Sequence, residues 1–281
     1  MTTQTENSIF SPDNLAKMAS EFGENGYTVV RGVFADNEIS EIRDTFMEQA
    51  KNGPVDGLSE KLHVAKDDND PLKFYPRMMH PHLHGDKLVG PVSMKYMLDA
   101  RLHDLLAAFM GDEPAAAQSM FYFKPAGARG QDLHQDNFYL RVAPDTCYAA
   151  WVAVDDADEE NGTMMVVPGS HSLEIFCPQK SDAKISFTDA YVPVPDGLEA
   201  VPLNLKAGDV LFFNGSVIHG SYPNQSKDRF RRAFICHYLP ATSTELSPSY
   251  PSMAFTGERI KFGAATGGGA CGNQFQAAPV H

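Results

Sequence analysis

The middle of the chain, from about residue 115 to residue 240, is a succession of short apolar or alternating segments. The segments with this pattern span residues 118–124, 148–154, 163–167, 209–213 and 232–238. Turn-forming pairs such as Asn161-Gly162 and Pro168-Gly169 stand between them. Many short strands at this spacing are typical of a barrel or sandwich, so the pattern predicts a mainly β core.

Helical patterns precede this β-rich region, and a tail rich in Ser, Pro and Gly follows it. Four elements are predicted before it: a helix from Pro12 to about Gly26, a strand at 27–31, a helix beginning at Asp36 or Asn37, and a helix at about 91–110. No shift in composition marks a second domain. We therefore expect one domain, residues 1–281, with helical support at about 11–110, a β core at about 115–240 and an irregular tail at 241–281.

The charge balance limits the partners of this chain. Its 23 Lys and Arg residues against 36 Asp and Glu residues give a net charge of −13, which argues against nucleic acid or an anionic membrane as a partner. No apolar run approaches the roughly 20 residues that span a bilayer, and the N-terminus carries no secretory pattern. The four cysteines lie far apart with no Cys-x-x-Cys pair, which predicts reduced thiols and a cytoplasmic protein, monomeric or homodimeric.

Metal-binding side chains occur at two places in the β-rich region. His134 and Asp136 are two residues apart, so on an extended strand both would point to the same face. His219 follows 83 residues later, and Arg231 lies twelve residues beyond His219. Two histidines and one carboxylate on one side of an ion form the ligand set of non-haem Fe(II) oxygenases, which leaves coordination positions for a 2-oxo acid and O₂. An arginine suits the far carboxylate of such a co-substrate.

A His-x-Asp pair alone is weak support for a metal site, because a chain with ten histidines can contain one by chance. The β-rich context, the second histidine and the arginine after it strengthen the interpretation. Two other function classes remain open. One is a non-catalytic jelly-roll metal- or ligand-binding protein, and the other is a zinc or manganese enzyme for hydrolysis or isomerisation, which would not need Arg231.

The order of several motifs resembles the phytanoyl-CoA dioxygenase family of Fe(II)/2-oxoglutarate-dependent oxygenases. The matching segments are 26–34, His134-Gln135-Asp136 with Tyr139, Trp151, Asn161-Gly162, Pro168-Gly169-Ser170-His171, and His219-Gly220-Ser221 followed by Phe230-Arg231-Arg232-Ala233. The resemblance implies a double-stranded β-helix (a jelly-roll, cupin-like core) with flanking helices. It also implies an oxidoreductase that uses Fe(II), 2-oxoglutarate and O₂ on a small-molecule substrate.

The resemblance also carries roles to particular residues. It implies that His134, Asp136 and His219 bind iron, and that Arg231, Ser221, Trp151 and Tyr122 contact 2-oxoglutarate. Arg231 lies one residue farther from His219 than is usual in the family, so Arg229 is the alternative, and Arg232 should face the opposite side of its strand. Gln118, Tyr139 and Phe138 are expected to contact the substrate.

The expected reaction is hydroxylation of a substrate C–H bond with release of succinate and CO₂. Desaturation, cyclisation and endoperoxide formation remain alternatives, as in natural-product biosynthesis. Halogenation is disfavoured, because the related halogenases lack the carboxylate that Asp136 supplies. The histidines His80, His82 and His84 are interpreted as a loop at the cavity mouth, with Arg77 as an additional cation, and His171 and His237 are interpreted as structural.

Overall fold

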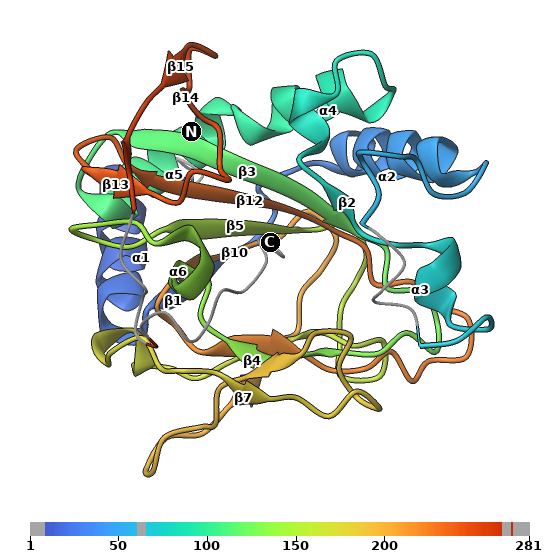
Figure 1. Ribbon diagram of the computed structural model, residues 1–281. Helices are drawn as coiled ribbons and strands as arrows, with labels where there is room; N and C mark the ends of the chain where they lie inside the picture. The colour runs from blue at the N-terminus through green and yellow to red at the C-terminus, as the bar shows by residue number, and fades with distance from the viewer. Residues whose placement is uncertain (1–8, 61–65, 266–270, 272–281) are drawn as a thin grey trace, which may run out of the picture.

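Two antiparallel sheets enclose the candidate site in the computed structural model, which describes residues 9–60, 66–265 and 271 (Figure 1). The larger sheet has the spatial order β1 (Tyr27–Val30), β10 (Val210–Asn214), β5 (Tyr148–Ala153), β12 (Ala233–Pro240), β3 (Pro114–Tyr122), β14 (Ser252–Ala254) and β15 (Arg259–Ile260), and β2 (Met78–Met79) also pairs with β3. The smaller sheet has the order β4 (Gln131–His134), β11 (His219–Ser221), β6 (Met164–Val166) and β9 (Val201–Pro202). Two short pairs lie outside these sheets: β7 (Gln179–Lys180) with β8 (Ala190–Tyr191), and β13 (Glu245–Leu246) with β16 (Gly263–Ala264).

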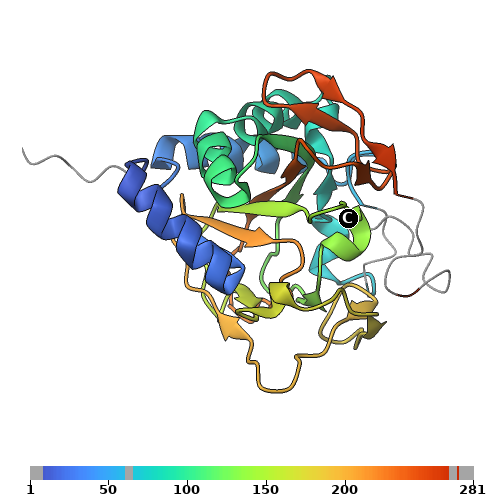
Figure 2. The same ribbon diagram turned by 90° about the vertical axis from the view of Figure 1, so that its left-hand side faces the viewer.

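The helices pack mainly on the outer side of the larger sheet (Figure 2). The longer ones are α1 (Pro12–Asn25), α2 (Asp36–Ala50), α4 (Val89–Met97) and α5 (Ala100–Met110). The short ones are α3 (Pro71–Phe74), α6 (Asn137–Leu140) and the 3₁₀ turns η2 (Pro81–Leu83) and η3 (Ser170–Ser172). The predicted first helix is confirmed with Ser11 as its N-cap and Gly26, at φ 78°, as its left-handed C-cap. The first strand and second helix are also confirmed at their predicted positions.

The single helix predicted at about 91–110 is wrong, because two helices occupy that range. Leu98 ends α4, and the Asp99 side chain accepts a hydrogen bond from the backbone N–H of Arg101. A carboxylate that caps a helix N-terminus satisfies one of its unpaired donors, so Asp99 favours a new start over a continuous helix. The apolar periodicity runs through both helices and therefore hides the break.

Aromatic side chains fill the layer between the helices and the larger sheet. Phe46 of α2 stacks on Phe121 of β3 with ring centroids 4.0 Å apart, and Phe234 of β12 lies 6.0 Å from Phe46. All three side chains are buried. Truncating a residue such as Phe46 to alanine would cost about 3–5 kcal/mol of stability. This layer holds the sheet rigid behind the site.

The inner face of the larger sheet is organised in rows that cross the strands. One row pairs Gln118 of β3 with His237 of β12. The next row joins Met120, Ile235 and Trp151, and it is apolar. The third row pairs Tyr122 with Ala233. Because side chains at positions i and i+2 of a strand share a face, each strand places several inward groups at intervals along the cavity.

The tail contains more regular structure than the sequence predicts. Its described residues form β13 to β16, and β14 joins the edge of the larger sheet beside β3. The prediction that all thiols are reduced is wrong, because Cys177 and Cys271 form a disulfide across 94 residues of sequence. Such a pair cannot be recognised from spacing, since the fold of the tail brings the two residues together. Cys147 and Cys236 are free and buried. Within the described residues, no helix combines the length and the apolar character needed to cross a membrane.

Candidate metal centre and co-substrate pocket

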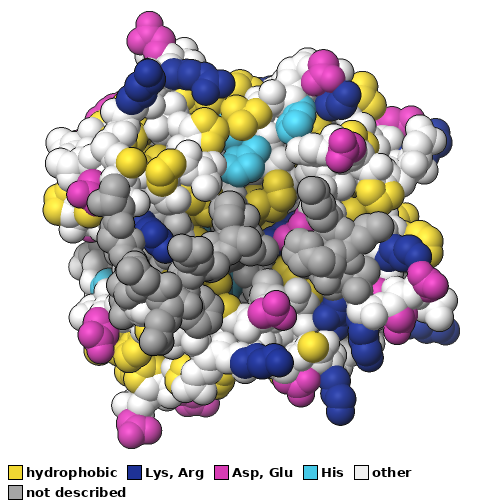
Figure 3. Space-filling model, in the orientation of Figure 1, with side chains coloured by type: hydrophobic (Ala, Val, Ile, Leu, Met, Phe, Trp, Pro, Cys, Tyr) yellow, Lys and Arg dark blue, Asp and Glu magenta, His cyan; other side chains and the backbone are white. Residues whose placement is uncertain are grey.

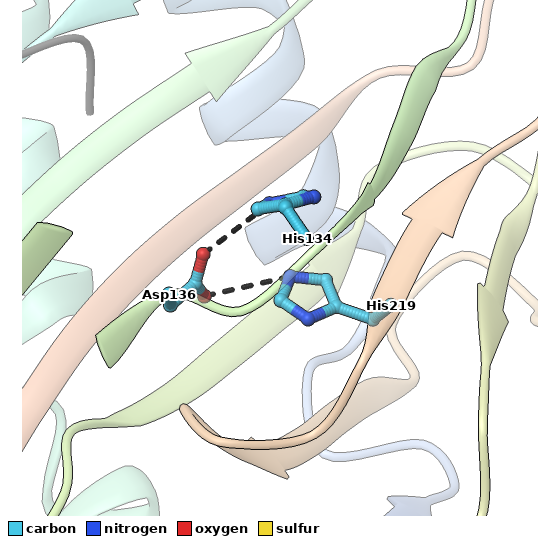
Figure 4. A group of neighbouring side chains, drawn as sticks. All are labelled: His134, Asp136 and His219. Atoms are coloured by element: carbon cyan, nitrogen blue, oxygen red, sulfur yellow. Dashed lines mark ion pairs between the residues drawn. The ribbon is translucent and has the colours of Figure 1, made fainter. Parts of the chain in front are cut away.

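The side chains of His134, Asp136 and His219 converge between the two sheets (Figure 4). Nε2 of His134 lies 3.3 Å from Oδ1 of Asp136, and Nε2 of His219 lies 3.5 Å from Oδ2. One candidate ligand atom from each residue lies within 4.8 Å of the other two, and all three side chains are buried. Two imidazole nitrogens and a carboxylate oxygen at these separations can bind a single divalent transition-metal ion on one face.

The local backbone at this site differs from the expected extended strand. Strand β4 ends at His134, and Asp136 has the helical dihedrals φ −65° and ψ −34° at the start of α6. The carboxylate therefore reaches the imidazole across a strand-to-helix turn and not along one strand face. His219 is the first residue of β11. It pairs directly with His134 on β4, which sets the two rings 4.3 Å apart.

Backbone carbonyls orient both imidazoles. Nδ1 of His134 lies 2.9 Å from the carbonyl of Asp132, and Nδ1 of His219 lies 2.9 Å from the carbonyl of Val217. A carbonyl can only accept, so each Nδ1 carries the proton and each Nε2 keeps a lone pair directed toward Asp136. This arrangement is typical of histidine ligands, whose second nitrogen is fixed by a hydrogen bond.

The charge states of the site also suit metal binding. Burial lowers the pKa of His219 to about 4, so its imidazole is neutral at physiological pH. Burial by itself would raise the pKa of the Asp136 carboxyl, but the imidazoles of His219, His237 and His134 hold that pKa well below its usual range. A neutral imidazole and an ionised carboxylate are the forms that bind metals.

His237 approaches the same carboxylate from the larger sheet. Its Nε2 lies 2.8 Å from Oδ2 of Asp136, across 101 residues of sequence. The interpretation of His237 as a purely structural histidine is therefore incomplete, because its ring fixes a candidate metal ligand. The sequence does carry a signal for this position, since His237 is six residues from Arg231 and the two share a face by period-2 spacing, although β12 itself begins at Ala233.

Arg231 closes the cavity at its other end. The side chain is buried, its Nε donates to the carbonyl of Gly162 at 3.0 Å, and its guanidinium lies 5.1 Å from the centroid of the Trp151 ring. Its Nη1 has no hydrogen-bond partner among the described residues. Burial lowers the pKa of Arg231 to about 10, so the group is still a cation at neutral pH. A buried cation with an unpaired donor fits an anionic ligand group.

Lys124 stands beside Arg231 and was not predicted from the sequence. Its Nζ donates to the Ser221 hydroxyl at 2.7 Å and to the Gly162 carbonyl at 3.1 Å. Burial, followed by repulsion from Arg231, lowers the pKa of Lys124 well below its ordinary value. A lysine at the end of the apolar segment 118–124 is the signal that could have identified it. Two basic side chains thus share one carbonyl, and the Ser221 hydroxyl lies next to them.

The neighbouring arginines serve other purposes. Arg229 is on the surface, where it pairs with Asp158 at 2.8 Å, and Arg232 pairs with Asp155 at 2.7 Å. Of the two alternatives for the co-substrate carboxylate, only Arg231 lines the cavity. Arg77 is buried but bonds to Glu60 and, at 2.7 Å, to the Tyr122 hydroxyl, so it does not act as an additional cavity cation.

The remaining predicted residues separate into two groups. Ser221, Trp151 and Tyr122 line the cavity that contains the three candidate ligands. Gln118, Phe138 and Tyr139 do not line it. Gln118 nevertheless shares the inner face of β3 and is fully buried, while Phe138 and Tyr139 belong to α6 directly after Asp136.

Gln131 is a further cavity residue that the sequence did not indicate. Its amide Nε2 lies 3.0 Å from Nε2 of His134, and its Oε1 lies 3.4 Å from the Tyr122 hydroxyl. The amide therefore donates to the lone pair that a metal would use, and it must turn away when a metal binds. His171 matches its structural interpretation, because Nε2 bonds to the carbonyl of Gly23 at the end of α1.

Comparison with known proteins agrees with this geometry. The family model for phytanoyl-CoA dioxygenase (PhyH) matches residues 22–233. The chain is 34% identical over 251 residues to phytanoyl-CoA dioxygenase 1 of Oryza sativa subsp. japonica, covering 80% of this chain and 89% of the rice protein. The chain therefore belongs to the phytanoyl-CoA dioxygenase family.

Solved structures support the same fold. The nogalamycin-biosynthesis epimerase SnoN, in complex with Fe³⁺, α-ketoglutarate and nogalamycin RO, superposes with a TM-score of 0.66 at 22% identity over 83% of this chain and 86% of SnoN. The carbocyclase SnoK superposes with a TM-score of 0.63 at 20% identity over 81% of this chain and 85% of SnoK. The jelly-roll prediction is confirmed, with open antiparallel sheets. The enzyme class is also confirmed as a non-haem iron, 2-oxoglutarate-dependent dioxygenase that uses Fe(II), 2-oxoglutarate and O₂.

Proposed function

We propose that this enzyme hydroxylates a C–H bond of a small-molecule metabolite. The observation that supports this most directly is one cavity with a buried two-histidine, one-carboxylate cluster at its centre and the unpaired guanidinium nitrogen of Arg231 at one end. When bound, Fe(II) and 2-oxoglutarate supply the oxidation: O₂ gives one oxygen atom to succinate and one to the substrate, and CO₂ leaves.

His134, Asp136 and His219 would hold the iron. The carbonyls of Asp132 and Val217 fix the ring orientations, so both Nε2 atoms are aligned before the metal arrives. Asp136 contributes the negative charge that offsets part of the metal charge, and His237 restricts the rotation of this carboxylate by its hydrogen bond to Oδ2.

Arg231 would bind the far carboxylate of 2-oxoglutarate, with the Ser221 hydroxyl beside it. Trp151 covers the guanidinium plane and limits its contact with water. Lys124 donates to the Ser221 oxygen, which leaves the Ser221 proton free to point toward the co-substrate. Tyr122 borders the same end of the cavity.

Gln118, Phe138 and Tyr139 would contact the substrate at the opposite end. Gln118 lies next to His237 across the sheet, and α6 carries the two aromatic rings beside Asp136. Within this proposal the protein acts as a single domain, residues 1–281, in the cytoplasm, and its substrate belongs to secondary metabolism. The assembly is a monomer or a homodimer.

The outcome of oxidation depends on where the substrate carbon lies. Desaturation, cyclisation or endoperoxide formation would use the same cofactors, and two proteins of this fold are named as an epimerase and a carbocyclase. Hydroxylation is preferred because it needs no further group from the protein. A non-catalytic binding protein would not require Arg231 beside a complete ligand cluster.

Anaerobic titration with Fe(II) and then 2-oxoglutarate tests the cofactor assignment. We expect a weak visible charge-transfer band that His134→Ala and Asp136→Ala eliminate, and absence of the band in the wild-type protein would refute the assignment. Candidate metabolites are then screened for stimulated succinate release. A product that gains one labelled oxygen atom from ¹⁸O₂ supports hydroxylation, and a product that gains none indicates desaturation or cyclisation.

A further inference from the structure

A row of polar side chains crosses the inner face of the larger sheet beside His237, which lines the cavity away from Arg231. Gln118 of β3 is the direct register partner of His237 of β12. The backbone N–H of His80 donates to the carbonyl of Ser119 at 2.8 Å, which places His80 beside Gln118 at the sheet edge. Tyr250 approaches from the tail, with its ring centroid 6.1 Å from that of His80. We define these four residues as the neutral row.

The polar atoms of the neutral row lack partners. Both amide atoms of Gln118, Nδ1 of His80, Nδ1 of His237 and the Tyr250 hydroxyl are buried without a hydrogen bond to any described residue. Gln118 is 0% exposed, His237 2% and Tyr250 4%. Buried polar atoms are nearly always paired, because an unpaired one loses its water without compensation. Several such atoms in one place indicate a ligand that supplies the partners.

His82, in the same region, has one paired and one unpaired ring nitrogen. It lies two residues from His80, but its Nδ1 is 2.7 Å from the Ser119 hydroxyl, on the other face of β3. It therefore belongs to the scaffold and not to the neutral row. The neutral row differs from it in position, because Gln118 and His237 lie on the inner face of the sheet and His237 contacts Asp136.

Three members of the neutral row, Gln118, His80 and Tyr250, offer no charge to match an ionic ligand. Burial lowers the pKa of His80 to about 4, and it raises the pKa of Tyr250. The closest approach to a charged group is the contact between His237 and Asp136, a candidate metal ligand. Gln118 offers one donor and one acceptor from a single planar group. Its complement is a ligand group with an acceptor and a donor side by side.

The surface near the co-substrate end also disfavours a polyanionic substrate. Arg229, Arg232 and Lys206 are each paired with an acid, at 2.8, 2.7 and 2.7 Å. On the face shown in Figure 3, basic and acidic side chains are interspersed around the periphery. The basic cluster at 229–232 therefore does not present a groove for the phosphates of a coenzyme A ester.

We propose that the neutral row is the substrate-recognition subsite, and that it takes an uncharged group of the lactam or carboxamide type. This inference rests on the proposed function, since it assigns the other end of the cavity to 2-oxoglutarate. It adds His80 and Tyr250 to the expected substrate contacts and names the chemistry that they recognise.

Ligand-observed NMR on the full-length Zn(II)-substituted protein with 2-oxoglutarate tests the subsite. The probes are three five-membered rings: 2-pyrrolidinone (an uncharged lactam), pyrrolidinium (a cation) and cyclopentanecarboxylate (an anion). We expect saturable binding of 2-pyrrolidinone in preference to both charged rings. Gln118→Leu should weaken that binding about tenfold, because it removes both amide atoms at similar volume. The exposed Gln179→Leu, on β7, is the matched control and should bind like the wild type.

Three results would overturn the inference. They are no binding of 2-pyrrolidinone, equal binding by wild type and Gln118→Leu, or preference for the anion. A preference for the anion would indicate binding in a second cavity on the tail, which Tyr250, Arg259 and Lys261 line. The Fe(II)–2-oxoglutarate band of each variant reports folding and cofactor binding. A normal band without lactam binding refutes the neutral row alone, whereas a missing wild-type band refutes the proposed function.

Discussion

The two ends of the cavity involve the same two strands, β3 and β12, with the residues directly beside them, and they differ in their polar groups. At one end the buried cation Arg231 and the buried Lys124 lie around Ser221, and at the other Gln118 and His237 have unpaired polar atoms. The apolar row of Met120, Ile235 and Trp151 separates the two. A fixed dianionic co-substrate needs permanent charge, whereas a variable substrate is selected by hydrogen bonds and shape. The comparison shows how one sheet can serve both purposes.

The largest effect is expected at the metal that must lie between these ends. His219→Ala removes one of three protein ligands, and Co(II) affinity, measured by calorimetry, should fall by more than about 100-fold. Succinate formation should fall to background. His171→Ala is the matched control, since His171 bonds only to the carbonyl of Gly23, and it should retain Co(II) affinity. Co(II) affinity that survives His219→Ala would contradict the ligand assignment.

Substitution of two arginines that are two residues apart tests the end of the cavity that contains Arg231. Arg231→Ala should raise the 2-oxoglutarate dissociation constant about 100-fold, because a buried charge-assisted contact is lost. Arg229→Ala should change it less than about threefold, since Arg229 pairs with Asp158 on the surface. Both constants follow from the visible-band titration. The reverse order would assign the carboxylate to Arg229.

Lys124 provides a smaller and more selective test of the same end. Lys124→Met keeps the length of the side chain and removes the donors to Ser221 and Gly162. We expect 2-oxoglutarate to bind about tenfold more weakly while thermal stability changes little, because the substitution also removes the desolvation cost of a buried ammonium. A purely structural lysine would show the opposite result, with lower stability and unchanged binding.

A separate test, on the free energy of unfolding and not on binding, distinguishes the unpaired polar groups from groups that serve folding. Burial lowers the pKa of His82 from 6.5 to about 3 in the folded protein. The unfolded chain therefore binds more protons between these values, so this stability contribution is complete above pH 6.5 and decreases as the pH falls toward 3. His82→Asn keeps a polar atom near Ser119 Oγ. It should reduce the loss of stability between pH 6.5 and 4 by on the order of 2 kcal/mol.

Urea unfolding at several pH values measures this effect. His84→Asn, on the same segment, is the control and should follow the wild-type pH dependence. An identical acid destabilisation in wild type and His82→Asn would show that His82 does not contribute to it. Stability effects of this size leave the 2-oxoglutarate constants at pH 7.5 unchanged.

Short-range patterns in the sequence predicted the strands well, and they selected three candidate ligands that the structure brings together. Residue spacing located His134, Asp136 and His219, and turn residues located the strands around them. The sequence did not predict that Asp136 begins a helix, because two residues after β4 are too few to show helical periodicity. It also did not predict the helix break at Asp99, since the apolar pattern continues through it.

Contacts between distant segments were beyond the sequence. His237 reaches Asp136 across 101 residues and Cys177 meets Cys271 across 94. The role of Lys124 can be recognised only from its contacts with the turn at Gly162 and with Ser221 of strand β11. Each of these depends on the pairing of strands, and no local propensity encodes the partner of a strand.

The glycine of the Asn161-Gly162 turn has a consequence for mutational tolerance. Its carbonyl accepts from both Lys124 and Arg231, and at φ +86° an added Cβ would lie 2.6 Å from the carbonyl oxygen of Tyr222. A side chain at this position would displace the Gly162 carbonyl oxygen, which accepts hydrogen bonds from both basic side chains. In a library of random variants selected for activity, position 162 should therefore be depleted of every other amino acid, although it touches neither metal nor substrate. The Asn161-Gly162 pair, which the sequence presents as an ordinary turn, is thus a position where substitution should impair the enzyme.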